Sequence, residues 1–94
     1  MSSESSWTFL TNHAHVLVLL SRDPDLRLRD LAAEIGITER AAQRIVSELA
    51  AEGYIELAKE GRRNHYTVLT DKPLRHPVER GATIADLLAA VSGR

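Results

Sequence analysis

The chain has 94 residues, of which 44% are hydrophobic and 27% are charged. This length and composition are typical of one small globular domain and argue against a fully disordered chain. Its 12 basic and 13 acidic residues give a formal net charge of −1, which argues against a protein that binds polyanions through a broad basic field. The absence of cysteine excludes disulfides and thiolate metal sites and suits a reducing compartment.

We do not expect a signal peptide at the N-terminus. Residues 1–6, MSSESS, are rich in serine, and we expect them to form a disordered tail. They provide neither the basic region nor the apolar core of a signal peptide. The longest apolar run, residues 16–20, is too short to cross a bilayer. We therefore expect a cytoplasmic protein that makes no membrane contact.

Apolar residues recur at helical spacing over residues 7–21, which predicts a first helix. They fall into two sets on different sides of that helix, so the helix should pack on its own domain and on something else. Pro24 forbids its continuation. The two sets are Trp7, Leu10, Ala14, Leu17 and Val18, and Phe9, Val16 and Leu20.

Two short helices joined by a tight turn are predicted next, after a brief extended piece at Leu26. The first covers residues 28–35, and Gly36 stands after it, where a positive φ is required. Thr38 is a suitable N-cap for a second helix over residues 39–52. Because so few residues join them, the two helices must cross steeply.

The C-terminal part predicts a hairpin and one more helix. After Gly53 the apolar period changes to that of strands, and the turn EGRR predicts a β-hairpin. A connector with two prolines should be extended, and Thr83 with Asp86 forms a capping box for the last helix. The fold class predicted is mainly α with a small β-hairpin. Its element order of helix, strand, helix, turn, helix, hairpin and helix is that of a winged helix-turn-helix.

Residues 26–68 resemble the core of the MarR- and ArsR-like bacterial and archaeal transcriptional regulators. The resemblance implies a winged helix-turn-helix that binds double-stranded DNA over residues 7–68, and a connector with a dimerisation helix over residues 69–94. Arg27 stands where many relatives have a capping Ser or Thr. The cysteine metal motif of ArsR-like sensors is absent, and short flanks imply a compact version. The matching residues are Leu31, Ala32, Gly36, Ile37, Thr38, Ala41, Arg44, Ile45, Leu49, Gly53, Ile55, Gly61, Arg62 and Tyr66.

The resemblance implies that the helix over residues 39–52 enters the major groove. Arginine can form paired hydrogen bonds with guanine and glutamine with adenine, and a helix N-terminus suits a phosphate. The alternative is a solvated helix face on which Arg44 pairs with Glu48. The DNA-binding residues predicted on this helix are Thr38, Glu39, Arg40, Gln43, Arg44 and Ser47.

The hairpin over residues 59–68 corresponds to the wing, which in winged domains lies along the backbone or in a minor groove that attracts arginine. The alternative is an ordinary polar turn whose charges protect an edge strand. Acidic residues such as Asp23 and Asp25 are expected to lie elsewhere. The predicted contacts of the wing are Lys59, Arg62, Arg63, Asn64 and His65.

A second predicted surface is apolar. It either covers the core of its own domain or pairs with a second copy to give a homodimer, which would read half-sites about one helical turn apart. A small-molecule effector of unknown identity has room between the first and last helices, although no polar groups visibly converge there. The predicted interface residues are Trp7, Leu10, Leu17, Ile84, Leu87, Leu88 and Val91.

No residue pattern nominates a catalytic, metal or cofactor site. His13 and His15 are two residues apart on a helix and face different sides, and His65 and His76 stand in no ligand pattern. We therefore expect no enzymatic activity, no metal and no cofactor. The alternative to DNA binding is a winged-helix module that binds another protein.

Overall fold

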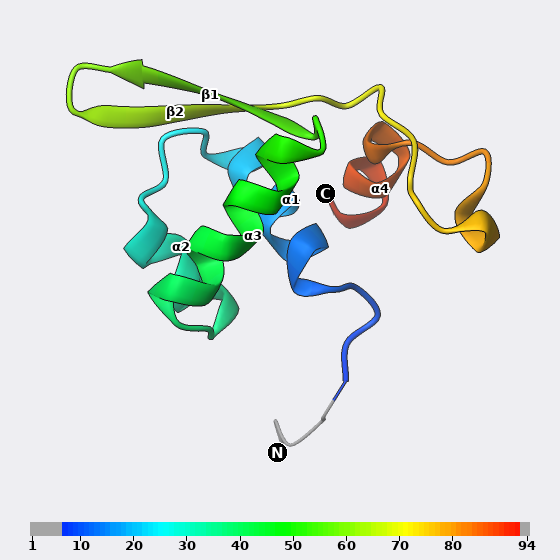
Figure 1. The fold of residues 1–94 in the computed structure, drawn as a ribbon. Helices are drawn as coiled ribbons and strands as arrows, with labels where there is room; N and C mark the ends of the chain where they lie inside the picture. The colour runs from blue at the N-terminus through cyan, green and yellow to red at the C-terminus, as the bar shows by residue number, and fades with distance from the viewer. Residues whose placement is uncertain (1–6, 93–94) are drawn as a thin grey trace.

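The computed structural model describes residues 7–92. This part of the chain forms four α-helices, one 3-10 turn and a two-stranded antiparallel sheet (Figure 1). The expected tail at residues 1–6 lies outside the described residues. None of the described helices is both long enough and apolar enough to span a membrane. The elements in chain order are α1 (Asn12–Arg22), α2 (Leu28–Ile35), α3 (Glu39–Ala51), β1 (Ile55–Glu60), β2 (Arg63–Val68) and α4 (Ile84–Ser92).

Helix α1 begins at Asn12, so the predicted start at Trp7 is wrong. Thr11 caps the helix, and its Oγ1 accepts a hydrogen bond of 3.2 Å from the Ala14 amide. The helical spacing of apolar residues continues across this cap. A helix start predicted from that spacing therefore lies too far toward the N-terminus. Trp7 and Phe9 precede the helix and stand edge to face, with ring centroids 5.0 Å apart.

The helix-turn-helix formed by α2 and α3 agrees with the prediction. Gly36 has a φ of 88°, and its amide donates to the Ala32 carbonyl oxygen over 2.8 Å, which ends α2. Thr38 caps α3, with its Oγ1 accepting from the Ala41 amide at 3.0 Å. Arg27 supplies no side-chain cap to α2.

The core lies where α1, α2 and α3 meet, with the base of the hairpin and the start of α4 closing it. Because the buried residues of α3 recur at helical spacing, one face of that helix is inside and the other is free. No polar or charged residue in the described part is buried. The core residues are Val16, Leu17, Leu20, Leu31, Ile45, Val46, Leu49, Tyr54, Ile55, Tyr66 and Ile84.

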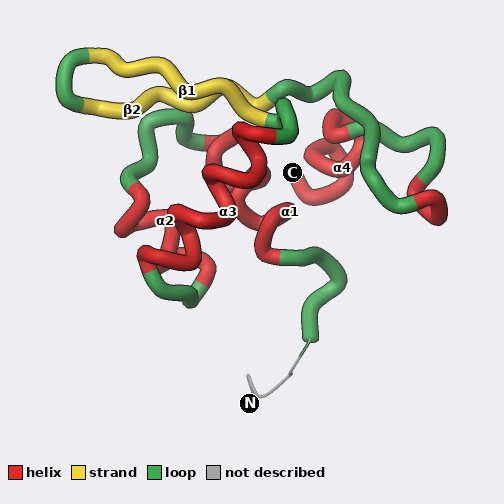
Figure 2. The backbone as a smooth tube through the Cα atoms, in the orientation of Figure 1, coloured by secondary structure: helices red, strands yellow, loops and turns green. Residues whose placement is uncertain are grey.

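The hairpin is confirmed, but the short strand expected near Leu26 is not formed in residues 7–92 (Figure 2). Glu60 pairs with Arg63, so the turn consists of two residues, and Gly61 takes a φ of 68° there. The segment before α2 makes only one backbone bond to the hairpin, from the Tyr66 amide to the Pro24 carbonyl oxygen over 2.9 Å.

The connector to α4 is not extended as predicted but folds into a closed loop. Pro73 and Thr83 form an isolated antiparallel bridge at its neck, and a 3-10 turn, Pro77–Glu79, stands inside it, capped by His76. The predicted capping box of α4 is present: the Thr83 amide donates to Asp86 Oδ2 over 2.9 Å. Loop closure depends on pairing between distant residues, which local proline content does not reveal.

Candidate nucleic-acid interface

The outward face of α3 is the predicted one. Burial of Ala42, Ile45 and Leu49 fixes the rotation of the helix, so the intervening positions project into solvent. The exposed residues of this face are Thr38, Glu39, Arg40, Gln43, Arg44 and Ser47. Their proposed contacts with DNA stay a prediction, whereas their orientation is observed.

Part of this face is internally bonded. Arg44 Nη1 lies 3.5 Å from Glu48 Oε2, and Glu48 Oε1 lies 2.7 Å from His13 Nε2. The hydrogen bond with His13 lowers the pKa of Glu48 below its usual value of 4.5, and the Arg44 charge acts in the same direction against slight burial. The Arg44 side chain is 64% exposed, so this pair is weak and Arg44 can leave it for another anion.

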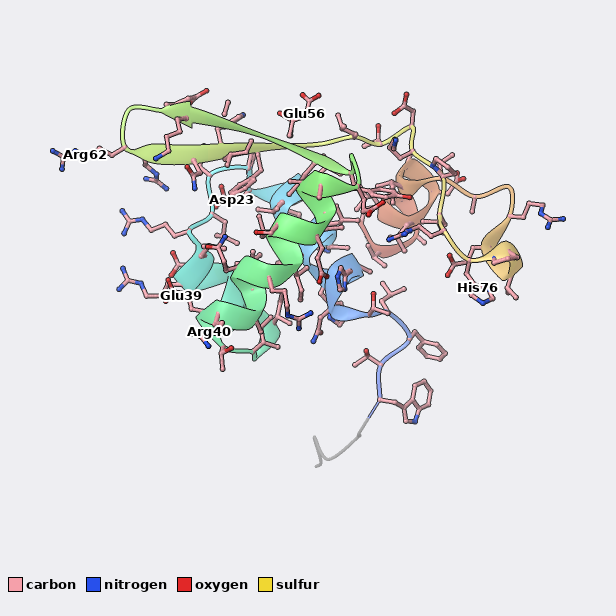
Figure 3. All side chains as sticks on the ribbon, in the orientation of Figure 1. Asp23, Glu39, Arg40, Glu56, Arg62 and His76 are labelled. Carbon is pink, nitrogen blue, oxygen red and sulfur yellow. The ribbon has the colours of Figure 1, made fainter. Side chains whose placement is uncertain are left out.

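Arg62 extends the basic surface from the wing. It occupies the two-residue turn and is exposed. Figure 3 shows Arg62 at the end of the hairpin, on the same side of the molecule as Glu39 and Arg40 at the start of α3, while Glu56 projects from the hairpin away from α3. The helix start and the wing end therefore face one side together.

The half of the wing next to its turn differs from the expectation, because Asp25 does not lie elsewhere. His65 Nδ1 lies 2.8 Å from Asp25 Oδ1, and Arg63 Nη2 donates to the Asp25 carbonyl oxygen over 2.9 Å. The hydrogen bond with Asp25 raises the pKa of His65 above 6.5, and the Glu60 charge adds to the rise against slight burial.

The predicted wing residues therefore divide into two groups. Arg63 and His65 bond to Asp25, and Asn64 Nδ2 donates weakly to the Tyr66 hydroxyl over 3.4 Å. Lys59 and Arg62 are exposed. Among the described residues of the wing, Lys59 and Arg62 are the cations whose side chains make no hydrogen bond or ion pair, so they can meet an external anion without first breaking one.

Asp25, Glu60 and His65 also bring three metal-ligating atoms within 4.8 Å of one another. Sequence patterns missed this cluster because Asp25 and His65 are 40 residues apart. All three side chains reach solvent, and Asp25 already bonds with His65, so the cluster needs no ion to explain it.

A cavity of about 680 Å³ opens between α1, α3, the connector and α4. The expectation that polar groups do not gather there is wrong. Its wall is mostly apolar and includes Leu10, Ala14, Leu17, Leu49, Ile84 and Leu87. Its rim is polar and includes His13, Glu48, Glu52, Arg75, His76 and Glu79. The rim arises because the connector folds back toward the end of α3, where Arg75 Nη2 lies 3.9 Å from Glu52 Oε1.

The predicted apolar interface is only partly available to a partner. Leu17 and Ile84 are 4% and 2% exposed and belong to the core of this chain, so they have almost no surface to offer. Leu88 packs partly against the same core. The predicted residues that expose part of their surface to solvent are Trp7, Leu10, Leu87, Leu88 and Val91.

Comparison with known proteins matches residues 8–63 to the sequence model of the MarR family. Among solved structures, the PcaV transcriptional regulator from Streptomyces coelicolor, in complex with its natural ligand, is 22% identical with a TM-score of 0.55 and is matched over 72% of this chain and 48% of its own. The zinc-dependent MarR family regulator AdcR, in its Zn(II)-bound state, is 24% identical with a TM-score of 0.58, over 96% and 57% of the two chains.

These identities show a shared fold, and the present chain spans about half the length of both structures, 48% and 57%. No curated protein matched the chain.

Proposed function

The chain belongs to the MarR family, and we propose that it is a transcriptional regulator that binds double-stranded DNA as a homodimer. Helix α3 lies in the major groove, and the wing lies along the backbone or in the adjacent minor groove. The observation that carries this proposal is the exposed set Arg40, Gln43 and Arg44 on the side of the molecule where Arg62 ends the wing (Figure 3).

Each residue of this face has a chemically suitable role. Arg40 and Arg44 can each form two hydrogen bonds with guanine, and Gln43 can do the same with adenine. The free amides at the start of α3, next to Thr38, suit a phosphate. Glu39 can accept from cytosine, and Ser47 extends the face toward the middle of the helix.

Dimerisation is supported by the apolar residues that the single chain leaves uncovered. Leu10 before α1 and Leu87 and Val91 on α4 retain free surface, and Trp7 is 64% exposed. A two-fold pair through these residues doubles the number of phosphate contacts, which a chain of net charge −1 needs. Two copies of α3 then read half-sites about 10 base pairs apart, or a multiple of that distance.

The cavity supports a second role, the binding of a small-molecule effector. Its mostly apolar wall and charged rim suit a small organic molecule with one polar end. Glu48 links this rim to Arg44, so a ligand that takes His13 away from Glu48 alters the partner of a proposed DNA contact. Thermal-shift screening should find ligands for the wild type that Leu87→Trp, which fills the cavity, no longer binds.

Duplex binding measured by fluorescence anisotropy at several salt concentrations tests DNA binding. We expect binding at low salt that weakens as salt rises. Arg62→Ala should lower the salt slope by about one, because one phosphate contact is lost. Arg80→Ala removes the same charge from an exposed position of the connector and should leave the slope unchanged. Undetectable binding at low salt, or no difference between these variants, contradicts the proposal.

The alternative, a winged helix that binds another protein, is favoured by the acidic residues Glu39, Glu48 and Glu60 among the basic ones. It predicts that the same titration shows no DNA binding even at low salt. Detectable binding that depends on Arg44 and Arg62 rules it out as the sole function of this face.

A further inference from the structure

Three hydrogen bonds hold the wing against the loop between α1 and α2. The Tyr66 amide donates to the Pro24 carbonyl oxygen over 2.9 Å, and Arg63 Nη2 donates to the Asp25 carbonyl oxygen over 2.9 Å. His65 Nδ1 lies 2.8 Å from Asp25 Oδ1. We call Asp25, Arg63 and His65 the wing clamp. It joins the hairpin to the segment next to Leu26, where the expected short strand is not formed.

The wing has little apolar packing of its own. Ile55 is the only buried residue of β1 and Tyr66 the only buried residue of β2. A two-stranded ribbon is marginally stable without further support. The core therefore anchors the hairpin through these two residues, and the wing clamp adds polar contacts nearer the turn.

Charged groups from three segments surround His65. Asp25 comes from the α1–α2 loop, Glu60 from β1 and Arg63 from β2 itself. Asp23 holds the loop in shape, because its Oδ1 accepts from the Asp25 amide at 3.1 Å. The two carboxylates next to His65 outnumber the one guanidinium, so this site favours the protonated ring.

We propose that Asp25 is a positioning residue for DNA binding, which holds the wing at its docking angle and reserves Arg63 and His65 for that task. Arg62 and Lys59 are then the wing cations that meet DNA. This inference rests on the proposed function of the domain. The hold is strongest while His65 carries its proton and weakens as the ring loses it.

The sign of one substitution separates this role from simple electrostatics. Asp25→Ala removes a negative charge close to the proposed DNA surface, so charge alone predicts tighter binding. Loss of the wing clamp predicts the opposite, a weakening of about twofold to fivefold, the range of an exposed ion pair. Asp25→Asn keeps an acceptor for His65 and should recover part of the loss.

The matched control is Glu56→Ala, which removes the same charge from an exposed position of β1 (Figure 3). It should bind DNA as tightly as the wild type or more tightly. Arg63→Ala should change the salt slope less than Arg62→Ala, because Arg63 bonds to Asp25. All titrations contain a chelator, so that no metal bridges Asp25, Glu60 and His65.

A second measurement needs no DNA. The His65 ring, followed by NMR, should titrate above pH 6.5 in the wild type and closer to 6.5 in Asp25→Ala. With DNA, the difference in affinity between the two proteins should be largest below the pKa of His65 and should shrink as pH rises through it. A folded core, checked by circular dichroism, keeps this comparison valid.

The two measurements separate the possible failures. If Asp25→Ala is folded and binds DNA as tightly as Glu56→Ala does, the positioning role is wrong. If neither the wild type nor any variant binds a duplex, the proposed function is wrong, and this DNA-binding role is wrong with it. The His65 titration then still decides the wing clamp, since a ring that titrates identically in the wild type and in Asp25→Ala contradicts it.

Discussion

Helix α3 and the wing, the two elements proposed to meet DNA, are held in the domain by different forces. Helix α3 buries Ala42, Ile45, Val46 and Leu49 against the rest of the core. The wing buries only one residue of each strand and is otherwise held by hydrogen bonds to Pro24 and Asp25. Apolar packing holds an element at every pH, whereas contacts between exposed charged groups are weak and respond to protons and salt.

This difference assigns different tasks to the two elements. A helix fixed by the core presents Arg40, Gln43 and Arg44 in a constant geometry, which base recognition requires. A wing held by a few polar bonds keeps its proposed docking angle only while those bonds persist, and protons and salt can weaken them. Substitutions that act on the core should therefore unfold the domain, and substitutions at the wing should leave it folded.

The largest effect is expected from the core that supports α3. Leu31→Ala, at a residue 1% exposed, should lower the free energy of unfolding by about 2–5 kcal/mol, because it leaves a cavity. Leu57→Ala makes the same chemical change on β1, where the side chain is 52% exposed. It should cost about 0.5 kcal/mol or less. Urea unfolding measures both, and equal losses would break the contrast between the helix and the wing.

The cap of α3 should have an intermediate effect. Thr38→Ala removes the acceptor for the Ala41 amide and should cost about 1 kcal/mol of stability. Thr38→Ser keeps the hydroxyl and should restore most of the loss in the same urea titration. If serine and alanine behave alike, the hydroxyl does not hold the start of this helix.

The smallest effect is expected at Glu48, in the last turn of α3, where the free energy of unfolding should depend on pH. The pKa of Glu48 is lowered in the folded state, so its stabilising contribution is present above pH 4.5 and is lost as pH falls through the lowered value. Glu48→Gln should remove this slope from the unfolding free energy at pH values below 4.5. A wild type and a variant with parallel pH profiles would show that the bond with His13 stabilises nothing.

The sequence specifies the helix-turn-helix because its signals are local. Leu28, Leu31 and Ile35 have helical spacing, Gly36 meets the positive φ, and Thr38 is a cap three residues from its donor. Each of these features acts over at most two helical turns, so the bounds of α2 and α3 follow from neighbouring residues. The exposed face of α3, though not its ligand, follows from the same periodicity.

The other features depend on residues that are far apart. The contact of Asp25 with His65, the charged rim of the cavity and the closed connector each join segments that no local pattern connects. The start of α1 was misplaced because Trp7 and Leu10 continue the apolar spacing beyond the cap at Thr11. Periodicity identifies faces, but it does not identify the partners that cover them.

The central claim is sequence-specific DNA recognition by α3. The most direct measurement is selection of bound duplexes from a random pool by the purified wild type, compared with Arg40→Ala combined with Arg44→Ala. The wild type should enrich one motif as two half-sites related by two-fold symmetry, about 10 base pairs apart or a multiple of that distance. The double variant should lose the preference while the wing is intact. Failure of the wild type to enrich any motif, or the same motif enriched by both proteins, would contradict this account.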